Sequence, residues 1–318
     1  MSDNIKNIEI KNFKIFDTFK MEGLKTVNLI GGKNNLGKTA LLEAISLNVS
    51  SLDLNNLLMS IKDILHKRNN HIEIDFFRQN TNKIDISTDK RKISLEYENK
   101  TPEAIVNLAI DEIKQGVNIS QIFSGPLLIN QYKTSKVNFI STGDIDDSYL
   151  SDLYASLVSK GKDEFLDEAL KLFDENIISV KQVVQGRAVF KLKMKNMKNP
   201  ILLNSLGEGI NRFMAIVCAI WASEDGYLFI DEIENGIHFT NLKKLWKLIF
   251  TVSQEANCQV FATTHSKECI EVFNDFNKSD DGAYFELYKN KKDEIVAKTR
   301  DYEQLEYSLT HGGSFRGE

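Results

Sequence analysis

Short apolar runs alternate with longer amphipathic segments through the last third of the chain. The runs at 227–230 and 258–262 predict buried strands, whereas apolar residues recur at helical spacing over 208–222 and 240–255. Strands that alternate with helices along a chain are typical of a parallel sheet covered by helices. We therefore expect an α/β lobe at this end of the chain.

The rest of the chain mixes strand-like and helix-like patterns. Apolar and polar positions alternate over 5–30, over 71–98 with a polar turn at about 80–82, and over 177–203, which predicts strands. Helical spacing predicts helices over 52–68, from Pro102 to about Lys114, and over 144–174. The chain has no heptad array, so we expect the piece at 144–174 to be small, without a long coiled coil.

Composition is that of an ordinary globular protein. Of the 318 residues, 42% are hydrophobic and 27% are charged, and the length suits one large or two modest domains. No apolar run approaches the roughly 20 residues that span a bilayer. The first residues lack the apolar core of a signal peptide. We therefore expect a cytoplasmic protein with no membrane segment.

Cysteines and net charge add little to this picture. Cys218, Cys258 and Cys269 form no Cys-x-x-Cys pair and lie in apolar surroundings, which predicts buried thiols rather than a metal site or disulfides. The net charge of −5 argues against DNA binding by the whole surface but leaves room for a local basic patch. Lysines cluster at 191–198, where a solvated strand face is the usual interpretation and a phosphate-facing patch the rarer one.

The strongest chemical signal is the segment from Gly32 to Thr39, which has the spacing of a phosphate-binding loop. An apolar run at 27–30 predicts a strand before it, and the stretch at 41–45 predicts a helix after it, which argues against a chance glycine-rich turn. Glycines let backbone N–H groups approach phosphate oxygens, and the helix turns its positive end towards the anion. The predicted nucleotide contacts are Gly32, Asn34, Asn35, Gly37, Lys38, Thr39 and Ala40.

Further polar positions follow the buried strands. The strand at 227–230 runs into Asp231-Glu232, so that Asp231 can lie beside a Mg²⁺ ligated by Thr39, and Glu232 can orient an attacking water. After the next strand, His265 can hydrogen-bond a γ-phosphate, although a histidine at a strand end is usually structural. These positions share the edge of the predicted sheet where such folds bind ligands.

A second anion cradle is predicted at the start of the helix at 208–222. Its residues are Ser205, Gly207, Glu208 and Gly209. An ordinary N-cap by Ser205 is the alternative. One nucleotide does not need two cradles in one chain, so we expect this cradle to close on the nucleotide of a second copy.

In this order the motifs resemble those of ABC-type ATPases, and more narrowly those of the SMC/RecF/OLD class. Gly32 to Thr39 matches the Walker A loop, 205–209 the signature loop, 229–232 Walker B, 233–238 the D-loop and 263–266 the histidine switch. The sequence DEIENGIH followed by TTHS is typical of short bacterial ATPases related to OLD proteins. The resemblance reaches from residue 5 to about residue 300.

Several departures narrow this resemblance. The Leu-Ser-Gly-Gly-Gln signature of transporter ATPases is absent, and Gln131 is a weak candidate for the Q-loop glutamine. SMC proteins carry long coiled-coil arms, whereas the inserted piece here is short. OLD nucleases carry a Toprim domain after the ATPase, and the residues after His265 offer no acidic metal-binding set of that kind.

The resemblance implies a two-lobed ABC-type ATPase head with a mixed sheet. The N-terminal lobe would span 1–142, a helical insertion 143–180 and the C-terminal lobe 181–318. It also implies Mg²⁺-dependent ATP hydrolysis in a homodimer or higher oligomer. Lys38, Glu232 and His265 would be the catalytic residues, Thr39 and Asp231 the metal ligands, and the signature loop would contact the partner's ATP.

The resemblance further implies a biological role. The short OLD-like ATPases suggest a regulatory or scaffold ATPase that restrains a separate effector protein in bacterial anti-phage defence by abortive infection. The alternative is a RecF-like ATPase that clamps duplex DNA in DNA repair. A transporter motor is disfavoured by the signature loop.

Overall fold

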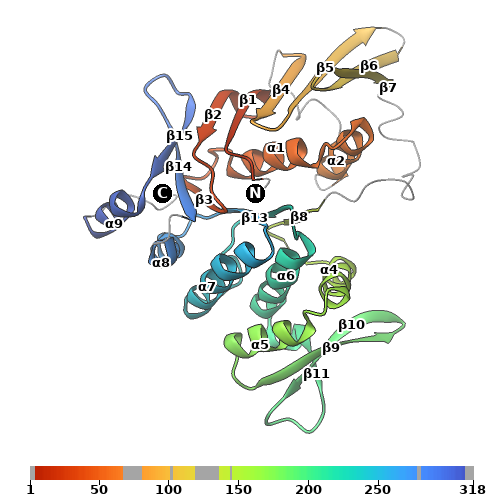
Figure 1. Ribbon diagram of the computed structural model, residues 1–318, viewed down its shortest axis with the longest axis vertical. Helices are drawn as coiled ribbons and strands as arrows, with labels where there is room; N and C mark the ends of the chain where they lie inside the picture. The colour runs from red at the N-terminus through yellow and green to blue at the C-terminus, as the bar shows by residue number, and fades with distance from the viewer. Residues whose placement is uncertain are drawn as a thin grey trace.

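The computed structural model describes residues 4–66, 81–100, 103–118, 136–143, 145–277 and 281–311. Within these ranges the strands form two six-stranded sheets and one three-stranded sheet, with helices between and around them (Figure 1). No helix in the described ranges is long and apolar enough to cross a membrane.

An antiparallel sheet near the N-terminus has the strand order β2-β1-β4-β5-β6-β7. Its strands are β1 (Asn7–Phe13), β2 (Phe16–Glu22), β4 (Lys83–Thr88), β5 (Lys92–Lys100), β6 (Glu103–Ile110) and β7 (Ile113–Asn118). Alternate side chains such as Ile8 and Ile10 of β1 enter the core, as the pleat of a strand requires. This core also takes in residues of α1 (Lys38–Ser50) and α2 (Leu54–His66), which confirms the helix predicted there.

One prediction in this region is wrong. The segment from Pro102 to Lys114 is not a helix but supplies β6 and the start of β7. Its apolar residues fit the helical period as well as the strand period, and Val106, Leu108 and Ile110 are buried at strand spacing. The turn expected at 80–82 lies at the edge of the described residues and stays a prediction, whereas β4 and β5 are joined by a turn at 89–90. The strand expected at 72–76 lies outside the described residues.

A mixed sheet with the order β15-β14-β3-β13-β12-β8 forms the centre of the molecule. Its strands are β3 (Val27–Gly32), β8 (Val137–Ile140), β12 (Tyr227–Ile230), β13 (Gln259–Thr263), β14 (Gly282–Lys289) and β15 (Ile295–Arg300). Neighbouring strands are parallel except for β14 and β15, which pair antiparallel. The predicted α/β class with a mixed sheet is confirmed.

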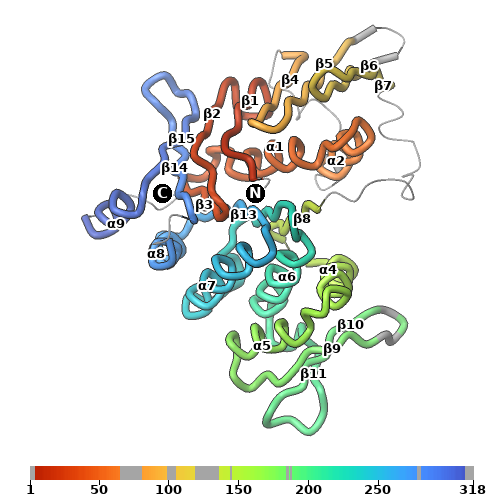
Figure 2. Tube along the Cα trace, viewed as in Figure 1, coloured from red at the N-terminus to blue at the C-terminus, as the bar shows by residue number. Residues whose placement is uncertain are grey.

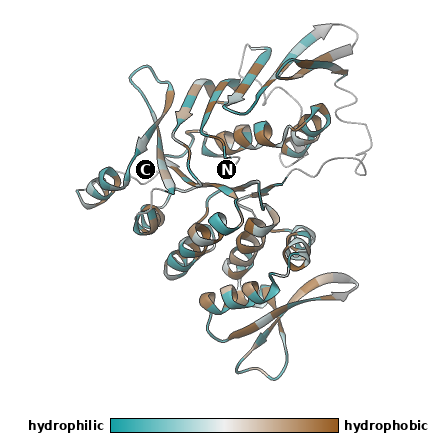
Figure 3. Cartoon of the chain, viewed as in Figure 1, coloured by the Kyte–Doolittle hydropathy of each residue, from teal (hydrophilic) through white to brown (hydrophobic). Residues whose placement is uncertain are grey.

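Both faces of the mixed sheet are buried, which explains its uninterrupted apolar runs. Leu228 and Ile230 of β12 face one hydrophobic core, while Phe229 between them faces the other. The Phe229 ring stacks on those of Phe139 and Phe261, with centroids 6.0 Å and 5.3 Å apart. Helix α1 covers one face, and α6 (Glu208–Ala222), α7 (Phe239–Glu255) and α8 (Lys267–Phe276) cover the other (Figure 3).

The piece inserted between β8 and α6 is compact. It contains α4 (Asp147–Ser159), α5 (Asp163–Phe173), the sheet of β9 (Ile177–Gln185), β10 (Arg187–Met194) and β11 (Ile201–Leu202), and the short 3₁₀ helix η1 (Leu203–Leu206). Phe190 and Leu192 of β10 join the core beneath α4 and α6, whereas Lys193 and Lys195 are exposed. The piece is small, as predicted, but it contains a sheet as well as helices and extends past residue 180. Exposed lysines fit a solvated face and a phosphate-facing patch alike, and no long coiled coil occurs in the described ranges.

The two ends of the chain interleave in the mixed sheet. Strand β3 lies between β13 and β14, so red and blue segments run side by side in Figure 2. Helix α9 (Tyr302–Thr310) follows β15. The division at 142 and 180 stays a prediction, and the sheet itself contains strands from both proposed lobes. The three cysteines are buried and unpaired, as predicted.

Candidate active site

The phosphate-binding loop connects β3 to α1, and its glycines are required by the backbone. Gly32 and Gly37 have φ of 137° and 79°, in the left-handed region that L-residues avoid. A Cβ on Gly32 would come 2.6 Å from the Leu287 carbonyl oxygen, and one on Gly37 would come 2.6 Å from Ile15 Cγ2. Helix α1 has no side-chain cap and no acidic residue in its first turn, so its N-terminal amides suit an anion.

Lys38 is the first residue of α1 and lies across the loop. Its Nζ donates to the carbonyl oxygens of Gly32 and Lys33 at 2.7 Å and 2.8 Å. Burial lowers the pKa of Lys38 to about 8, and the carboxylates of Glu232, Asp231 and Glu234 act in the opposite direction. The ammonium is therefore held over the loop in a partly desolvated position, where a phosphate would favour its charged form.

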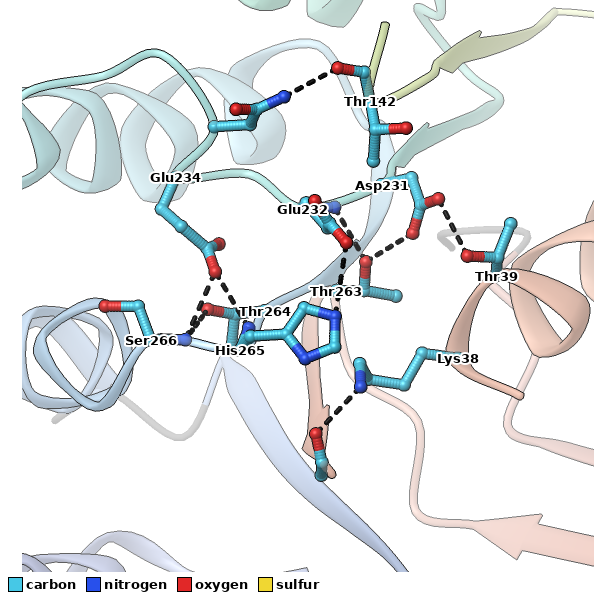
Figure 4. Close-up of polar contacts among 12 residues, drawn as sticks. Lys38, Thr39, Thr142, Asp231, Glu232, Glu234, Thr263, Thr264, His265 and Ser266 are labelled. Atoms are coloured by element: carbon cyan, nitrogen blue, oxygen red, sulfur yellow. Dashed lines mark hydrogen bonds and ion pairs between the residues drawn. The ribbon is translucent and has the colours of Figure 1, made fainter. Parts of the chain in front are cut away.

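Asp231 follows β12 and connects the end of β13 to the first turn of α1. Its Oδ2 accepts a hydrogen bond from Thr39 Oγ1 at 2.8 Å, and its Oδ1 accepts one from Thr263 Oγ1 at 2.6 Å (Figure 4). The Thr263 oxygen in turn accepts from the Glu232 amide at 2.8 Å. A carboxylate and a hydroxyl at this separation are the hard oxygen donors that Mg²⁺ takes from a protein beside phosphate oxygens, so the donor set fits the predicted metal.

Glu232 and His265 face each other beside this group. His265 Nε2 lies 3.2 Å from Glu232 Oε1, and both side chains are partly exposed. Glu232 has a φ of 48°, an uncommon conformation for this residue type and one that often marks functional sites. The sequence placed His265 near a γ-phosphate but did not predict its contact with Glu232.

The signature segment at 205–209 lies apart from the contacts that the phosphate loop makes within this chain. Gly207, with a φ of 92°, caps α6 without a side-chain bond, so the alternative of an ordinary N-cap by Ser205 is wrong. Ser205, Gly207 and Glu208 are exposed, and Gly209 is half-buried. A Cβ on Gly209 would lie 2.3 Å from the Gly236 carbonyl oxygen, so α6 touches the D-loop backbone here. The structure thus brings Lys38, Thr39, Asp231, Glu232 and His265 together and leaves the signature loop facing solvent.

Arg212 on α6 is a site residue that sequence reasoning missed. Its side chain is buried, with a relative exposure of 4%, and Nη1 donates to the Ser141 carbonyl oxygen at 2.7 Å. Nη2 donates to the carbonyl oxygens of Asp231 and Glu232 at 2.5 Å and 3.0 Å. A charged residue directly before the apolar stretch at 213–222 was the available signal, because a buried charge needs specific partners.

A cavity of about 500 Å³ lies beside Thr39 and Asp231, between α1, α2 and the segment that follows β8. Ser141 and Thr142, directly after β8, line it. Thr142 also accepts a hydrogen bond from the Asn235 side chain at 2.6 Å through its carbonyl oxygen. Gln131, the candidate for the Q-loop glutamine, lies outside the described residues. Ser141 and Thr142 lie at the end of the strand next to Walker B.

The fold is that of an ABC-type ATPase head, and the comparisons with known proteins support an ATP-hydrolysing enzyme. Residues 144–270 match the family model of the AAA ATPase domain, which includes the signature loop, Walker B and His265 but not the phosphate loop. An ATP/GTP phosphatase of Helicobacter pylori is 26% identical over 365 residues, which cover 95% of this chain and 97% of that protein. An uncharacterized protein of Methanocaldococcus jannaschii is 36% identical over 87 residues, or 26% of this chain and 40% of that protein.

Solved structures give the same fold at low sequence identity. The SMC head bound to the C-terminal winged-helix domain of ScpA has a TM-score of 0.60 at 12% identity, over 95% of this chain and 99% of that one. The SMC head domain of Thermotoga maritima has a TM-score of 0.51 at 12% identity, over 94% and 98%. These likenesses support the SMC-like form of the ABC-type head.

Proposed function

We propose that the protein hydrolyses ATP to ADP and phosphate with Mg²⁺, and that ATP closes a dimer which hydrolysis reopens. The observation that carries the proposal is the 2.8 Å contact between Thr39 and Asp231, which joins the Walker A and Walker B segments. These two residues would hold Mg²⁺, which supplies charge neutralisation on the phosphate oxygens when bound. Lys38 and the loop amides would bind the phosphates themselves.

Glu232 and His265 act on the attacking water and the γ-phosphate. Glu232 orients the attacking water and accepts its proton, and His265 Nε2 lies 3.2 Å from Glu232 Oε1. From that position Nε2–H can donate to the carboxylate before ATP binds and turn to a γ-phosphate oxygen once ATP is present. Each of these interactions serves the transferring group in the transition state, where such positioning has its largest effect.

A second copy would complete the site. Ser205, Gly207 and Glu208 are exposed at the N-terminus of α6, an arrangement that suits an anion brought by another molecule. If each signature loop closes on the partner's ATP, both nucleotides lie between the two chains. Bound ATP would then hold the dimer shut, and loss of the γ-phosphate would release it.

The output of this cycle is proposed to be regulation of a separate effector protein in anti-phage defence. Support comes from the resemblance of 231–238 and 263–266 to short OLD-like ATPases that lack a Toprim domain. A pull-down from the native host with and without ATP tests this role. Capture of one effector in an ATP-dependent manner would support it, and recovery of the ATPase alone in both conditions would contradict it.

The hydrolysis itself is tested with matched variants of two residues. Wild-type protein should release phosphate from ATP only with Mg²⁺, and GTP should be measured beside it because of the name of the Helicobacter relative. Lys38→Ala should lose nucleotide binding, whereas Glu232→Gln should bind ATP normally and stop turnover, since an amide cannot act as a base. Wild-type protein that binds no nucleotide by calorimetry would refute the proposal.

Duplex DNA as a partner is the second candidate, and one observation favours it. Lys181 and Lys191 lie directly opposite each other on β9 and β10, with Lys193 exposed on the same face of the sheet. Like charges in such pairs repel, and a phosphate backbone would relieve the repulsion. ATP-dependent binding to duplex DNA that weakens steeply with salt would support this role, and salt-independent or absent binding would reject it.

A further inference from the structure

Glu234, two residues beyond Glu232, makes a pair of contacts that no motif assignment explains. Its Oε1 accepts hydrogen bonds from the backbone amides of His265 and Ser266, at 2.8 Å and 3.1 Å (Figure 4). The side chain thus reaches from the segment after β12 to the segment after β13. It binds the main chain of His265, whereas Glu232 contacts the ring of the same residue.

The setting of these contacts makes them strong. The two amides precede α8, which Ser266 caps by accepting from the Cys269 amide at 3.1 Å. A carboxylate at a helix N-terminus interacts favourably with the helix dipole, and bonds to a charged acceptor are stronger than neutral ones. The second oxygen of Glu234 is buried without a hydrogen-bond partner among the described residues, so the carboxylate bears a desolvation cost that these two amides offset.

We propose that Glu234 is a positioning residue that holds the His265 loop so that the imidazole meets Glu232. The inference rests on the proposed hydrolysis and deepens it by assigning the residue that sets the histidine. Glu234 belongs to the D-loop, whose Gly236 carbonyl packs against Gly209 of α6. One side chain therefore connects the segment in contact with the signature helix to the histidine of the active site.

A double-mutant cycle between Glu234 and His265 tests this role. Glu234→Ala should lower kcat about 10- to 100-fold, because a small misplacement of a catalytic group has effects of this size. ATP affinity should change less than about threefold, since Lys38 and Thr39 are untouched. In a His265→Ala background the same substitution should cause little further loss, because Glu234 acts through the histidine. Equal losses in both backgrounds would overturn the proposal.

Two further variants separate positioning from general damage. Glu234→Gln keeps an oxygen that can accept from both amides and should retain most of the turnover, whereas a loss equal to that of Glu234→Ala would overturn the proposed clamp. Glu268→Ala is the matched control, because Glu268 contacts the Ser266 hydroxyl at 2.9 Å rather than the His265 amide. It should leave kcat unchanged.

A readout that needs no turnover keeps this inference distinct from the proposed function. In the folded protein, the backbone amide proton of His265 should move upfield in NMR spectra on Glu234→Ala and stay near its place on Glu268→Ala. An unmoved signal would overturn the clamp even in an active enzyme. If the wild-type protein proves inactive but Glu234→Ala still moves the His265 amide signal, the hydrolysis is rejected and the clamp stands.

Discussion

Arg212 contacts Asp231 through the main-chain oxygen, at 2.5 Å, and leaves the Asp231 carboxylate to Thr39 and Thr263. The guanidinium therefore fixes the end of β12 from behind. Burial lowers the pKa of Arg212, and the nearby carboxylates of Asp231, Glu234 and Glu232 oppose that shift. The arginine thus supports the Walker B segment without occupying the oxygens that a metal would need.

Arg212→Lys should destabilise the protein and slow its turnover. An ammonium cannot reach the Ser141, Asp231 and Glu232 carbonyl oxygens together. The Glu232 oxygen keeps the Asn235 amide as a donor, but each other buried acceptor left without a donor costs about 1–3 kcal/mol. We expect the free energy of unfolding in urea to fall by about 2–4 kcal/mol, and kcat to fall at nearly constant ATP affinity. Arg300→Lys is the control, because the Glu286 carboxylate that Arg300 contacts can still pair with an ammonium. A stable, fully active Arg212→Lys variant would contradict this role.

ATP binding should take up protons in mildly alkaline solution. The pKa of Lys38 is lowered to about 8, chiefly by burial, and bound phosphate should raise it again. Affinity should therefore be constant well below pH 8 and decline as the pH rises through 8. Calorimetry at pH 8.5 in buffers of different ionisation enthalpy should show net proton uptake. In Lys38→Arg, whose side chain stays charged, this uptake should vanish, and its persistence would assign the proton to another group.

Gly207→Arg should block dimer closure but not ATP binding within the chain. A Cβ on Gly207 would meet no atom within 4 Å, so the monomer has space for the side chain. Gly207→Ala carries the same backbone strain, about 1–3 kcal/mol at φ 92° and ψ 174°, without the bulk or the charge, and should keep ATP-driven dimerisation in ultracentrifugation.

Mixing Gly207→Arg with Lys38→Ala sharpens this test. A mixed dimer holds one composite site with an intact phosphate loop from the first chain and an intact signature loop from the second. Partial recovery of hydrolysis is expected on mixing. Hydrolysis by a monomer, unchanged per chain on dilution and indifferent to Gly207→Arg, would reject the shared site.

Gly209→Ala should lower stability through a clash between backbones. The new Cβ would lie 2.3 Å from the Gly236 carbonyl oxygen, too close for any contact, so α6 or the D-loop must shift. We expect a loss of about 1–3 kcal/mol in the free energy of unfolding. Gly143→Ala, whose Cβ would meet nothing within 4 Å, should change stability by less than about 0.5 kcal/mol. Equal stability of the two variants would show that the segments separate freely.

Local signals in the sequence located the phosphate loop and the two strand ends beside it. Gly32 and Gly37 stand where the backbone needs positive φ, and Asp231 follows a strand buried on both faces. These features depend on neighbours in the chain, so one sequence suffices to find them. The β6–β7 hairpin was missed because its apolar residues fit the helical period as well as the strand period.

Contacts between distant segments could not be predicted in this way. Arg212 meets Ser141, and Glu234 meets His265, only because parallel strands bring separate loops to one edge. Strand order and register determine which residues come into contact, and the local spacing of residues in the sequence predicts neither. An arginine in a mostly apolar helix indicates that the side chain has a buried partner, but it does not identify that partner.

The position of β3 in the sheet has a consequence for biosynthesis. Its partners β13 and β14 end at residues 263 and 289, so the strand that carries the phosphate loop is made long before the strands that flank it. At about 5–20 residues per second, the nascent β3 waits roughly 10–50 s for them. ATP thus has no complete pocket on the ribosome until β14 has been made, and a chain truncated before β14 leaves the loop without the strand that packs against Gly32.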